Sequence, residues 1–278
     1  MDHTHPGVPS IPVAQYAETV YERYRNSFYP EEREQIPFLK FMKIQPFIFN
    51  WKNQFDKTRE IEKSLKSIFG KVTVINSDEN NTEPGWVNIG NDAYFTAQFY
   101  TALSLFDGDV LFHVQGDVYY HKWQKLVEDS IKYMQHYDAG IYAPNINNTA
   151  WSSQIVDLDL KTQHENIRAV STTDETVWFI KKEIIHEFFR RKIDMSQNKI
   201  GWGWDIIFAA ICFSNKKLII RDYNHLVLHA KGRGYEDKTA DSQLRPVIDR
   251  LDADLKALFI DILTGNHKEL EKIFLTNV

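Results

Sequence analysis

From residue 38 onward, short apolar runs alternate with longer charged segments in which apolar residues recur every three or four positions. A short continuous apolar run is typical of a buried strand, whereas the three-to-four spacing indicates a helix with one buried face. The pattern predicts strands at 46–51, 71–76, 109–114, 140–143 and 177–180, and helices at 54–69, 92–106, 122–136 and 182–191. Strands separated by helices of this length predict an α/β domain with a mostly parallel sheet.

The second half of the chain is less regular. Residues 144–174 are polar with two strand-like pieces, and an apolar helix follows 201–205 and runs to about residue 213. Short strands are expected at 218–220 and 226–228. The domain flanked by helices is therefore expected to extend over residues 37–240.

Both ends of the chain are predicted to be helical. In residues 1–36, a four-residue spacing places Tyr16, Val20, Tyr24 and Phe28 on one helical face. Residues 241–278 carry a similar apolar stripe. We expect an N-terminal helical extension and a C-terminal helical segment, and either stripe can pack on the domain or form a homo-oligomer.

Composition narrows the function classes. With 43% hydrophobic and 26% charged residues the chain has the balance of a globular protein, and its net charge of -5 gives no basic surface for nucleic acid. No apolar run approaches the ~18 residues of a membrane span, and the N-terminus lacks a secretory signal pattern. Cys212 is the single cysteine and cannot form an internal disulfide. We expect a cytoplasmic enzyme, with peripheral attachment at the inner membrane face left open.

Candidate chemistry begins where strands end. In an open parallel sheet, ligands bind at the carboxyl ends of the strands. Asp78 follows the second predicted strand and Asp117 follows the third. These two carboxylates are therefore predicted to lie at the binding edge.

The literal Asp-x-Asp sequence at 107–109 does not lie at the carboxyl end of a predicted strand. It precedes the third strand, so about eight residues at ~3.3 Å each separate it from Asp117 by roughly 26 Å. Asp107 and Gly108 are better interpreted as a turn. The informative segment is Gln115-Gly116-Asp117, in which Gly116 would let the backbone approach a ligand.

His229 is the best partner for Asp117 in a metal site. A single aspartate holds a divalent cation weakly, and His229 ends a strand directly before a loop that carries Lys231 and Arg233. Basic side chains and exposed N–H groups suit a diphosphate. The alternative is an ordinary histidine at a strand end beside a basic turn.

The segment Gly201-Trp202-Gly203-Trp204-Asp205 is the most distinctive string in the chain. Its tryptophans offer stacking faces for a sugar, and Asp205 opens an apolar helix. The helix N-terminus favours the charged carboxylate, so Asp205 is expected to be ionised at neutral pH and able to act as a general base. The alternative is a simple helix cap.

In order and spacing, residues 44–235 resemble the GT-A (Rossmann-like) glycosyltransferase fold, including the inverting enzymes of family two. The segment 115–117 stands at the place of the Asp-x-Asp metal motif, and 201–205 is similar to the Gly-Trp-Gly-x-Glu-Asp motif of galactosyltransferases. His229 matches a histidine that completes the metal site in several of these families. The sequence departs from the pattern at Gln115, which replaces an acid, and at Trp204, which replaces the Glu.

The resemblance implies a metal-dependent transfer of a sugar from a nucleotide-sugar donor to a hydroxyl of a glycan or glycolipid acceptor. Asp205 would be the base, and Asp117 and His229 would hold Mn or Mg. The residues implied for the donor are Asn50, Trp51, Asp78, Gln115, Gly116, Asp117, Lys231 and Arg233, and those for the acceptor are Trp202, Gly203 and Trp204.

Two other interpretations stay open. The missing acids at Gln115 and Trp204 also suit a catalytically silent GT-A-like protein that binds nucleotides or glycans or serves as an assembly subunit. Another nucleotide-using enzyme, such as a nucleotidyltransferase, is disfavoured because residues 50–53 after the first strand contain no glycine for a phosphate loop.

Overall fold

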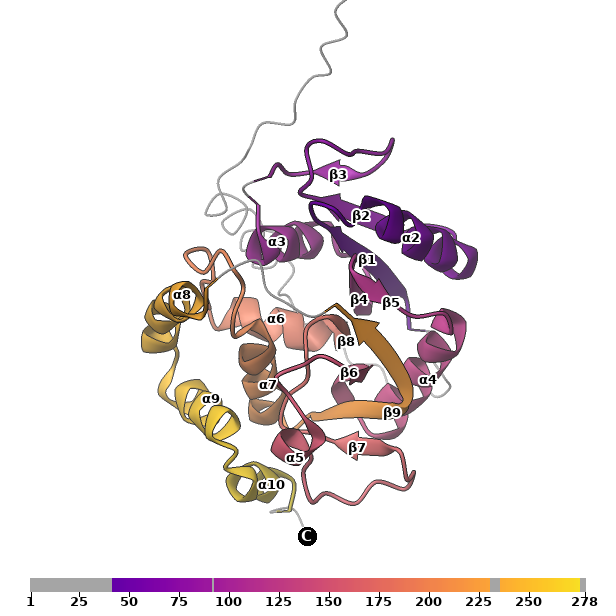
Figure 1. Cartoon of the computed structure of the whole chain (residues 1–278). Helices are drawn as coiled ribbons and strands as arrows, with labels where there is room; N and C mark the ends of the chain where they lie inside the picture. The colour runs from indigo at the N-terminus through magenta and orange to yellow at the C-terminus, as the bar shows by residue number, and fades with distance from the viewer. Residues whose placement is uncertain (1–41, 92, 231–235, 276–278) are drawn as a thin grey trace, which may run out of the picture.

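A computed structural model of the chain describes residues 42–91, 93–230 and 236–275. Within these ranges a nine-stranded sheet has the order β3-β2-β1-β4-β8-β6-β9-β5, and β7 pairs with β9 (Figure 1). The predicted helical extension at 1–36 and the loop residues Lys231 and Arg233 lie outside the described residues.

The strands are β1 (Ile44–Asn50), β2 (Thr73–Asn76), β3 (Val87–Asn88), β4 (Val110–Gln115), β5 (Val118–Tyr119), β6 (Ala139–Ile146), β7 (Ile167–Ala169), β8 (Val177–Lys181) and β9 (Leu218–His229). The helices are α2 (Phe55–Phe69), α3 (Phe95–Leu105), α4 (Trp123–His136), α5 (Ser153–Val156), α6 (Lys182–Arg190), α7 (Trp204–Ser214), α8 (Asp237–Arg250), α9 (Ala253–Thr264) and α10 (His267–Leu275).

The predicted α/β fold is confirmed, and the sheet is mixed. β1 pairs in parallel with β2 and β4, and β6 pairs in parallel with β9. β8 lies between β4 and β6 and is antiparallel to both. The loop that leads into β8 therefore arrives at the edge where β4 ends, which adds polar residues to the carboxyl edge.

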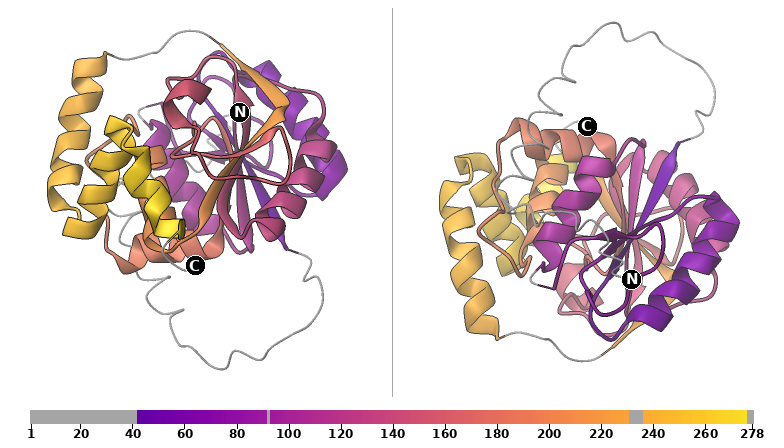
Figure 2. Two further views of the ribbon diagram at one scale, coloured as in Figure 1. Left: turned by 90° about the horizontal axis from the view of Figure 1, so that it is seen from below. Right: turned by 90° about the horizontal axis from the view of Figure 1, so that it is seen from above.

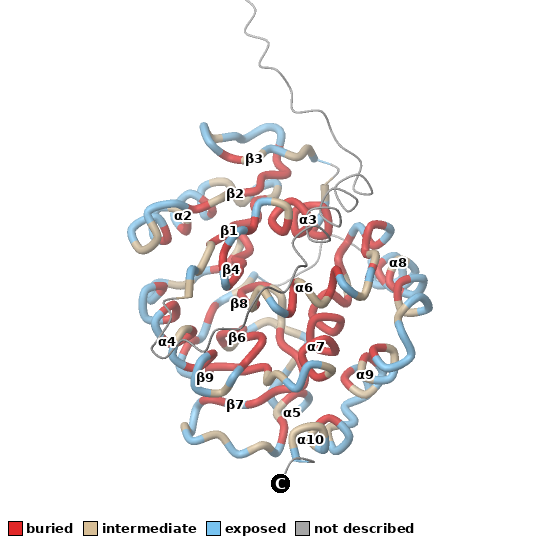
Figure 3. Tube along the Cα trace, turned by 180° about the vertical axis from the view of Figure 1, so that it is seen from behind, coloured by how far each residue is buried: buried red, intermediate tan, exposed pale blue. Residues whose placement is uncertain are grey.

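Alternation along the central strands divides the core into two layers. In β1, Phe47 and Phe49 face the layer of α3, α6, α7 and α9, whereas Ile48 faces the layer of α2 and α4. Successive strand residues point to opposite faces, so an apolar run is needed when both faces are covered. Helix α7 is apolar on all sides because it packs against α6, α9 and the sheet (Figure 3).

Helix α2 shows how the local sequence sets the boundaries of an element. Its buried residues Thr58, Ile61 and Leu65 recur at helical spacing and face the sheet. Gly70 ends the helix with a φ of 71°, and its backbone N–H donates to the carbonyl of Lys66. Glycine adopts this conformation without the clash of a Cβ atom, which suits it to this position at the end of the helix.

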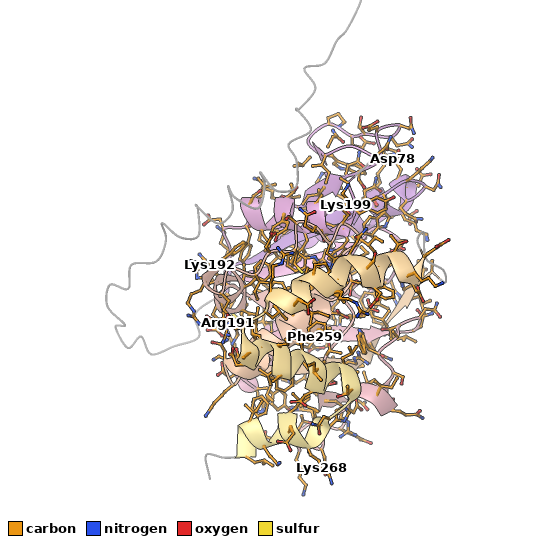
Figure 4. All side chains as sticks on the ribbon, turned by 90° about the vertical axis from the view of Figure 1, so that its left-hand side faces the viewer. Asp78, Arg191, Lys192, Lys199, Phe259 and Lys268 are labelled. Carbon is orange, nitrogen blue, oxygen red and sulfur yellow. The ribbon has the colours of Figure 1, made fainter. Side chains whose placement is uncertain are left out.

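The structure differs from the prediction in the last third of the domain. The two expected strands at 218–220 and 226–228 are parts of one strand, β9, which curves around the sheet (Figures 1 and 2). The C-terminal helical segment begins at Asp237 and is divided into α8, α9 and α10, which lie alongside one another on one side of the molecule (Figure 4). Among the described residues, none of the helices is long and apolar enough to cross a membrane.

Candidate functional site

Two chain segments bring Asp117 and His229 together. Asp117 lies in the turn between β4 and β5, and the register of the β5–β9 pair places Val118 opposite His229. As a result, Nε2 of His229 lies 3.2 Å from Oδ2 of Asp117. The predicted meeting of these two side chains is present in the structure.

The Asp117–His229 pair has the properties of a cation site. Oδ1 of Asp117 is buried and has no hydrogen-bond partner among the described residues, although a buried polar atom normally has one. The hydrogen bond to Asp117 raises the pKa of His229 above its usual value. A carboxylate oxygen and an imidazole nitrogen are ligands that divalent ions such as Mn²⁺ accept. These residues therefore fit the predicted metal.

The literal Asp-x-Asp sequence lies at the amino end of β4, as expected. The Asp109 carboxylate accepts a hydrogen bond from the backbone N–H of Lys43, and the ammonium of Lys43 lies 3.3 Å from the Asp107 carboxylate. These carboxylates stabilise the turn into β4. They are separated from Asp117 by the length of that strand.

The backbone at Gly116 lies close to two neighbouring elements. A Cβ atom at this position would lie 2.3 Å from Oγ1 of Thr58 and 2.8 Å from the carbonyl oxygen of Phe49. The close approach to α2 and β1 is therefore one reason for glycine at this position, and the approach of a ligand to its backbone remains a prediction. Gln115 is 9% exposed, and its backbone N–H donates to the carbonyl of Thr176, which ties β4 to the start of β8.

One cation near this pair was not predicted. The exposed side chain of Lys57 on α2 reaches Asp117, with its Nζ 3.4 Å from the Asp117 carbonyl oxygen. The sequence gives no sign of this contact, because Lys57 is one of several charged residues on an amphipathic helix.

Asp205 is held in a buried setting at the start of α7. It is 7% exposed, its Oδ2 accepts a hydrogen bond of 2.6 Å from the indole Nε1 of Trp151, and its Oδ1 accepts one from the N–H of Ile206. Burial, with a smaller contribution from the charge of Asp174, raises the pKa of Asp205 to about 7. The expectation that Asp205 is ionised at neutral pH is therefore met only in part, because desolvation outweighs the helix N-terminus and the hydrogen bonds.

Two residues of the segment Gly201–Asp205, Trp204 and Gly203, pack inside the protein, which was not predicted. Trp204 is fully buried, donates from Nε1 to Oγ1 of Thr96 and packs among aromatic rings, so its predicted role as a stacking face is wrong. Gly203 has a φ of 87°, and a Cβ atom there would lie 2.7 Å from Cδ1 of Leu244. Its close approach is to α8. Trp202 is half-buried and is the tryptophan of this segment that still has an exposed face.

Asp174 and Glu175, which precede β8, were not among the predicted site residues, yet they interact electrostatically with them. The charge of Asp174 raises the pKa of both Asp205 and His229. Burial raises the pKa of Glu175 well above its usual range, and the charge of Asp205 adds to the effect. Their position follows from the direction of β8, which the sequence does not reveal. Because β8 is antiparallel to β4 and β6, the residues just before it lie at the edge where those strands end.

Two of the residues expected to bind the donor, Asn50 and Asp78, lie in buried polar surroundings. The Asn50 side chain is fully buried, donates 2.6 Å to Oδ1 of Asn76 and accepts 2.7 Å from Oγ1 of Thr58. The prediction that the Asn50 side chain contacts the donor is therefore wrong. Its buried amide instead links β1 to β2 and to α2. Asp78 is 1% exposed and its carboxylate accepts bonds from its own loop, whereas Trp51 is half-buried.

A cavity of about 270 Å³ adjoins the glycine-tryptophan segment. It is lined by Tyr94, Lys199, Ile200, Glu236, Thr239 and Gln243. Tyr94 is 49% exposed, so an aromatic face and several polar groups lie beside residue 201. This combination suits a sugar, which presents hydroxyls at its rim and C–H groups on its faces.

Comparisons with known proteins identify the fold. No protein family and no curated protein matches the sequence. The structure is similar to GalNAc-T7 with UDP, GalNAc and Mn²⁺, with a TM-score of 0.55, 12% identity, and coverage of 83% of this chain and 56% of that one. It is also similar to residues 1–349 of S. aureus TarS in complex with UDP-GlcNAc, with a TM-score of 0.51, 13% identity, and coverage of 85% and 74%.

These similarities show a common fold. The chain spans little more than half the length of GalNAc-T7. It has the GT-A glycosyltransferase fold, as the order of its motifs predicted.

Proposed function

We propose that this chain is an inverting glycosyltransferase that transfers a sugar from a nucleotide-sugar donor to a hydroxyl of a glycan or glycolipid acceptor. The observation that carries the proposal is the contact between Asp117 and His229 at the carboxyl edge of a GT-A sheet, with Oδ1 of Asp117 buried and unpartnered among the described residues. GalNAc-T7 was crystallised with UDP and Mn²⁺, and TarS with UDP-GlcNAc.

The donor diphosphate would lie over Asp117 and His229, which would hold a divalent ion such as Mn²⁺ or Mg²⁺. The bound ion would supply charge neutralisation for the leaving diphosphate. Lys57 supports this placement because its ammonium lies beside Asp117. Lys231 and Arg233 are proposed to contribute from the loop that follows His229, and Trp51 and Asp78 to line the nucleoside end of the site.

Asp205 is proposed to act as the general base. Its carboxylate takes the proton of the acceptor hydroxyl, the hydroxyl oxygen bonds to the anomeric carbon, and the bond from that carbon to the diphosphate oxygen breaks. Attack from the face opposite the leaving group inverts the anomeric carbon. The bond from the Trp151 indole holds the carboxylate in one orientation, and a pKa of about 7 suits a base that works near neutral pH.

The acceptor is proposed to bind against Trp202 and the neighbouring cavity. Trp202 is half-buried, and Ile200, two residues before it, lines the cavity. Gly203 and Trp204 then stabilise the conformation of this segment through packing, without contacting the acceptor. The buried Trp204 fixes the start of α7, and through it the position of Asp205.

Thermal-shift measurements with nucleoside diphosphates, with and without Mn²⁺ or Mg²⁺, test the metal-dependent donor site. A ligand that binds only the folded state raises the melting temperature by mass action, and 100 times Kd corresponds to about 2.7 kcal/mol. We expect a shift with UDP or another diphosphate that grows when the metal is added. Asp117→Asn should remove the metal-dependent part of the shift.

Asp107→Asn is the matched control, because Asp107 belongs to the literal Asp-x-Asp sequence at the other end of β4. It should leave the metal-dependent shift unchanged. Loss of the shift in Asp107→Asn and its retention in Asp117→Asn would reverse the assignment.

A catalytically silent protein with the same fold is the second candidate, favoured by Gln115 at the place of an acid. It predicts nucleotide binding without turnover. Once a bound donor is known, slow hydrolysis of that donor in the wild type and its loss in Asp205→Asn would exclude this candidate.

A further inference from the structure

A buried cluster behind the proposed donor site joins three elements of the fold. Its centre is His225 of β9, which is 3% exposed. Nδ1 of His225 lies 2.5 Å from the hydroxyl of Tyr120, the residue that follows β5, and Nε2 lies 2.9 Å from Oδ2 of Asp129 on α4. Asp222 completes the cluster, with its Oδ2 3.7 Å from the same Nε2.

The ligand atoms of Asp129, Asp222 and His225 all lie within 4.8 Å of one another, so their spacing would accommodate a cation. Each side chain, however, already has a protein partner. Lys125 lies 2.5 Å from the other oxygen of Asp129. The hydroxyl of Tyr142 donates to Asp222 over 2.8 Å, and the N–H of Asn224 donates to its second oxygen. A cluster satisfied in this way does not need an ion.

The position of the cluster in β9 indicates another purpose. Along β6, Pro144 pairs with Asp222 and the next residue, Asn145, pairs with Leu226. Residues 223–225 are therefore left without partners on β6, and β9 bulges there before it continues to His229. A bulge bends its strand and redirects the side chains that follow.

The residues after the bulge are the ones that pair with β5. Val118 lies opposite His229 and Tyr119 opposite Leu228. Because side chains alternate along a strand, a slip of one residue in this short pair would turn His229 away from Asp117. A two-residue strand is too short to fix its own register, so the bond between Tyr120 and His225 supplies a second attachment between the same two segments.

We propose that His225 and Tyr120 are positioning residues that hold the β9 bulge and the β5–β9 register, so that His229 faces Asp117. The Tyr120 hydroxyl donates to Nδ1, which leaves the proton of His225 on Nε2, where it donates to Asp129. Asp129 and Asp222 orient the imidazole from α4 and from the start of the bulge. The inference rests on the proposed metal-dependent donor site and adds the residues that set its geometry.

The test is the Mn²⁺-dependent affinity for UDP, measured by calorimetry with and without the ion. Tyr120→Phe removes one hydroxyl and keeps the ring. We expect it to weaken the Mn²⁺-dependent binding about tenfold, as loss of a group that orients a metal ligand typically does. The metal-free affinity for UDP should be unchanged. A merely structural role would lower both affinities together, and that result would overturn the proposal.

Tyr137→Phe is the matched control. Tyr137 directly follows α4, and its hydroxyl lies 2.7 Å from Nδ1 of another histidine, His164. It should leave Mn²⁺-dependent binding unchanged. A loss of affinity in Tyr137→Phe as large as that in Tyr120→Phe would contradict a specific role for Tyr120.

Two further variants separate the possible failures. If Asp117→Asn abolishes the Mn²⁺ effect and Tyr120→Phe does not reduce it, the positioning proposal alone fails. If Asp117→Asn has no effect, the proposed donor site is wrong and the inference falls with it. Bound Mn²⁺ that persists in Asp117→Asn and disappears in Asp129→Asn would show that the cluster itself holds the ion, which also overturns the proposal.

Discussion

Asp205 is a carboxylate whose two oxygens accept bonds from Trp151 and Ile206 in a site that excludes most water. Because burial raises its pKa from 3.8 to about 7, the ionised base is the minor form below pH 7 and the major form above it. We expect sugar transfer to increase through pH 6 to 8 with a midpoint near pH 7, measured as kcat/KM for the donor that the binding screen identifies. Asp205→Asn should abolish transfer across this range.

The same pKa shift makes a prediction for stability that serves as an independent control. A carboxylate with a raised pKa in the folded state contributes stability that is fully present below pH 3.8 and is lost as the pH rises to about 7. The loss is at most about 1.4 kcal/mol per pH unit within that window. Asp205→Asn removes it, so the free energy of unfolding of the variant relative to wild type should be higher at pH 8 than at pH 5. Equal differences at both pH values would contradict the raised pKa.

Single residues also show what the sequence does and does not determine about the site. The meeting of Asp117 and His229 follows from their places at strand ends, and the structure shows it. The protonation of Asp205 was not predictable, because it depends on how much of the fold covers it. The burial of Trp204 was not predictable either, since Trp202 and Trp204 look alike in sequence and their exposures are decided by the turn between them.

At the scale of elements, the turn into α7 depends on Gly203. Its φ of 87° is unfavourable for any residue with a Cβ atom, and a Cβ there would lie 2.7 Å from Leu244 of α8. Gly203→Ala should therefore lower the free energy of unfolding by about 1–3 kcal/mol for the backbone and a further ~1–3 kcal/mol for overpacking. Denaturant unfolding measures this change. The rate of sugar transfer should also fall, because the proposed base Asp205 lies only two residues after Gly203.

Gly85→Ala is the matched control for the backbone contribution. Gly85 has a φ of 91° and no atom within 4 Å of the position of an added Cβ. Gly85→Ala should therefore lower the free energy of unfolding only by the backbone contribution, about 1–3 kcal/mol. If the two variants lose the same stability, the contact between Gly203 and Leu244 does not matter for α7.

The elements themselves were predictable to different degrees. The helices and strands of the first half carry clear periodicity, and α2, α4 and α6 begin and end close to the predicted residues. β9 was divided in two because Arg221, Asp222 and His225 interrupt its apolar pattern. These polar residues are buried in the structure, where they contact residues that are distant in the sequence: Nη1 of Arg221 donates to the carbonyl of Trp151, and Nε2 of His225 lies 2.9 Å from Oδ2 of Asp129. A partner that lies far away in the sequence leaves no local signal.

At the scale of the whole molecule, the sequence predicts the α/β class but not which layers depend on one another. The C-terminal segment was expected as a separate helical unit, and that division remains a prediction. In the structure, α9 packs on α7, and Arg191, the residue that follows α6, pairs with Glu187 of α6 and with Asp254 at the start of α9 (Figure 4). Self-association through the terminal helices also remains a prediction; on α9, Ile260 and Leu263 are exposed apolar residues.

The packing of α9 on α7 gives a test of whether the C-terminal helices and the sheet unfold together. Phe259 is 1% exposed and belongs to the same apolar cluster as α7, whereas Ile260, the next residue, is 48% exposed. Phe259→Ala should lower the free energy of unfolding by about 3–5 kcal/mol, and Ile260→Ala by far less. Denaturant unfolding followed by far-UV circular dichroism and tryptophan fluorescence should show one coincident transition for wild type and for Phe259→Ala. If the helical signal of the variant is lost before the fluorescence changes, α8–α10 form an independent unit. One shared transition would mean that the helix carrying Asp205 is stable only with α9 docked on it.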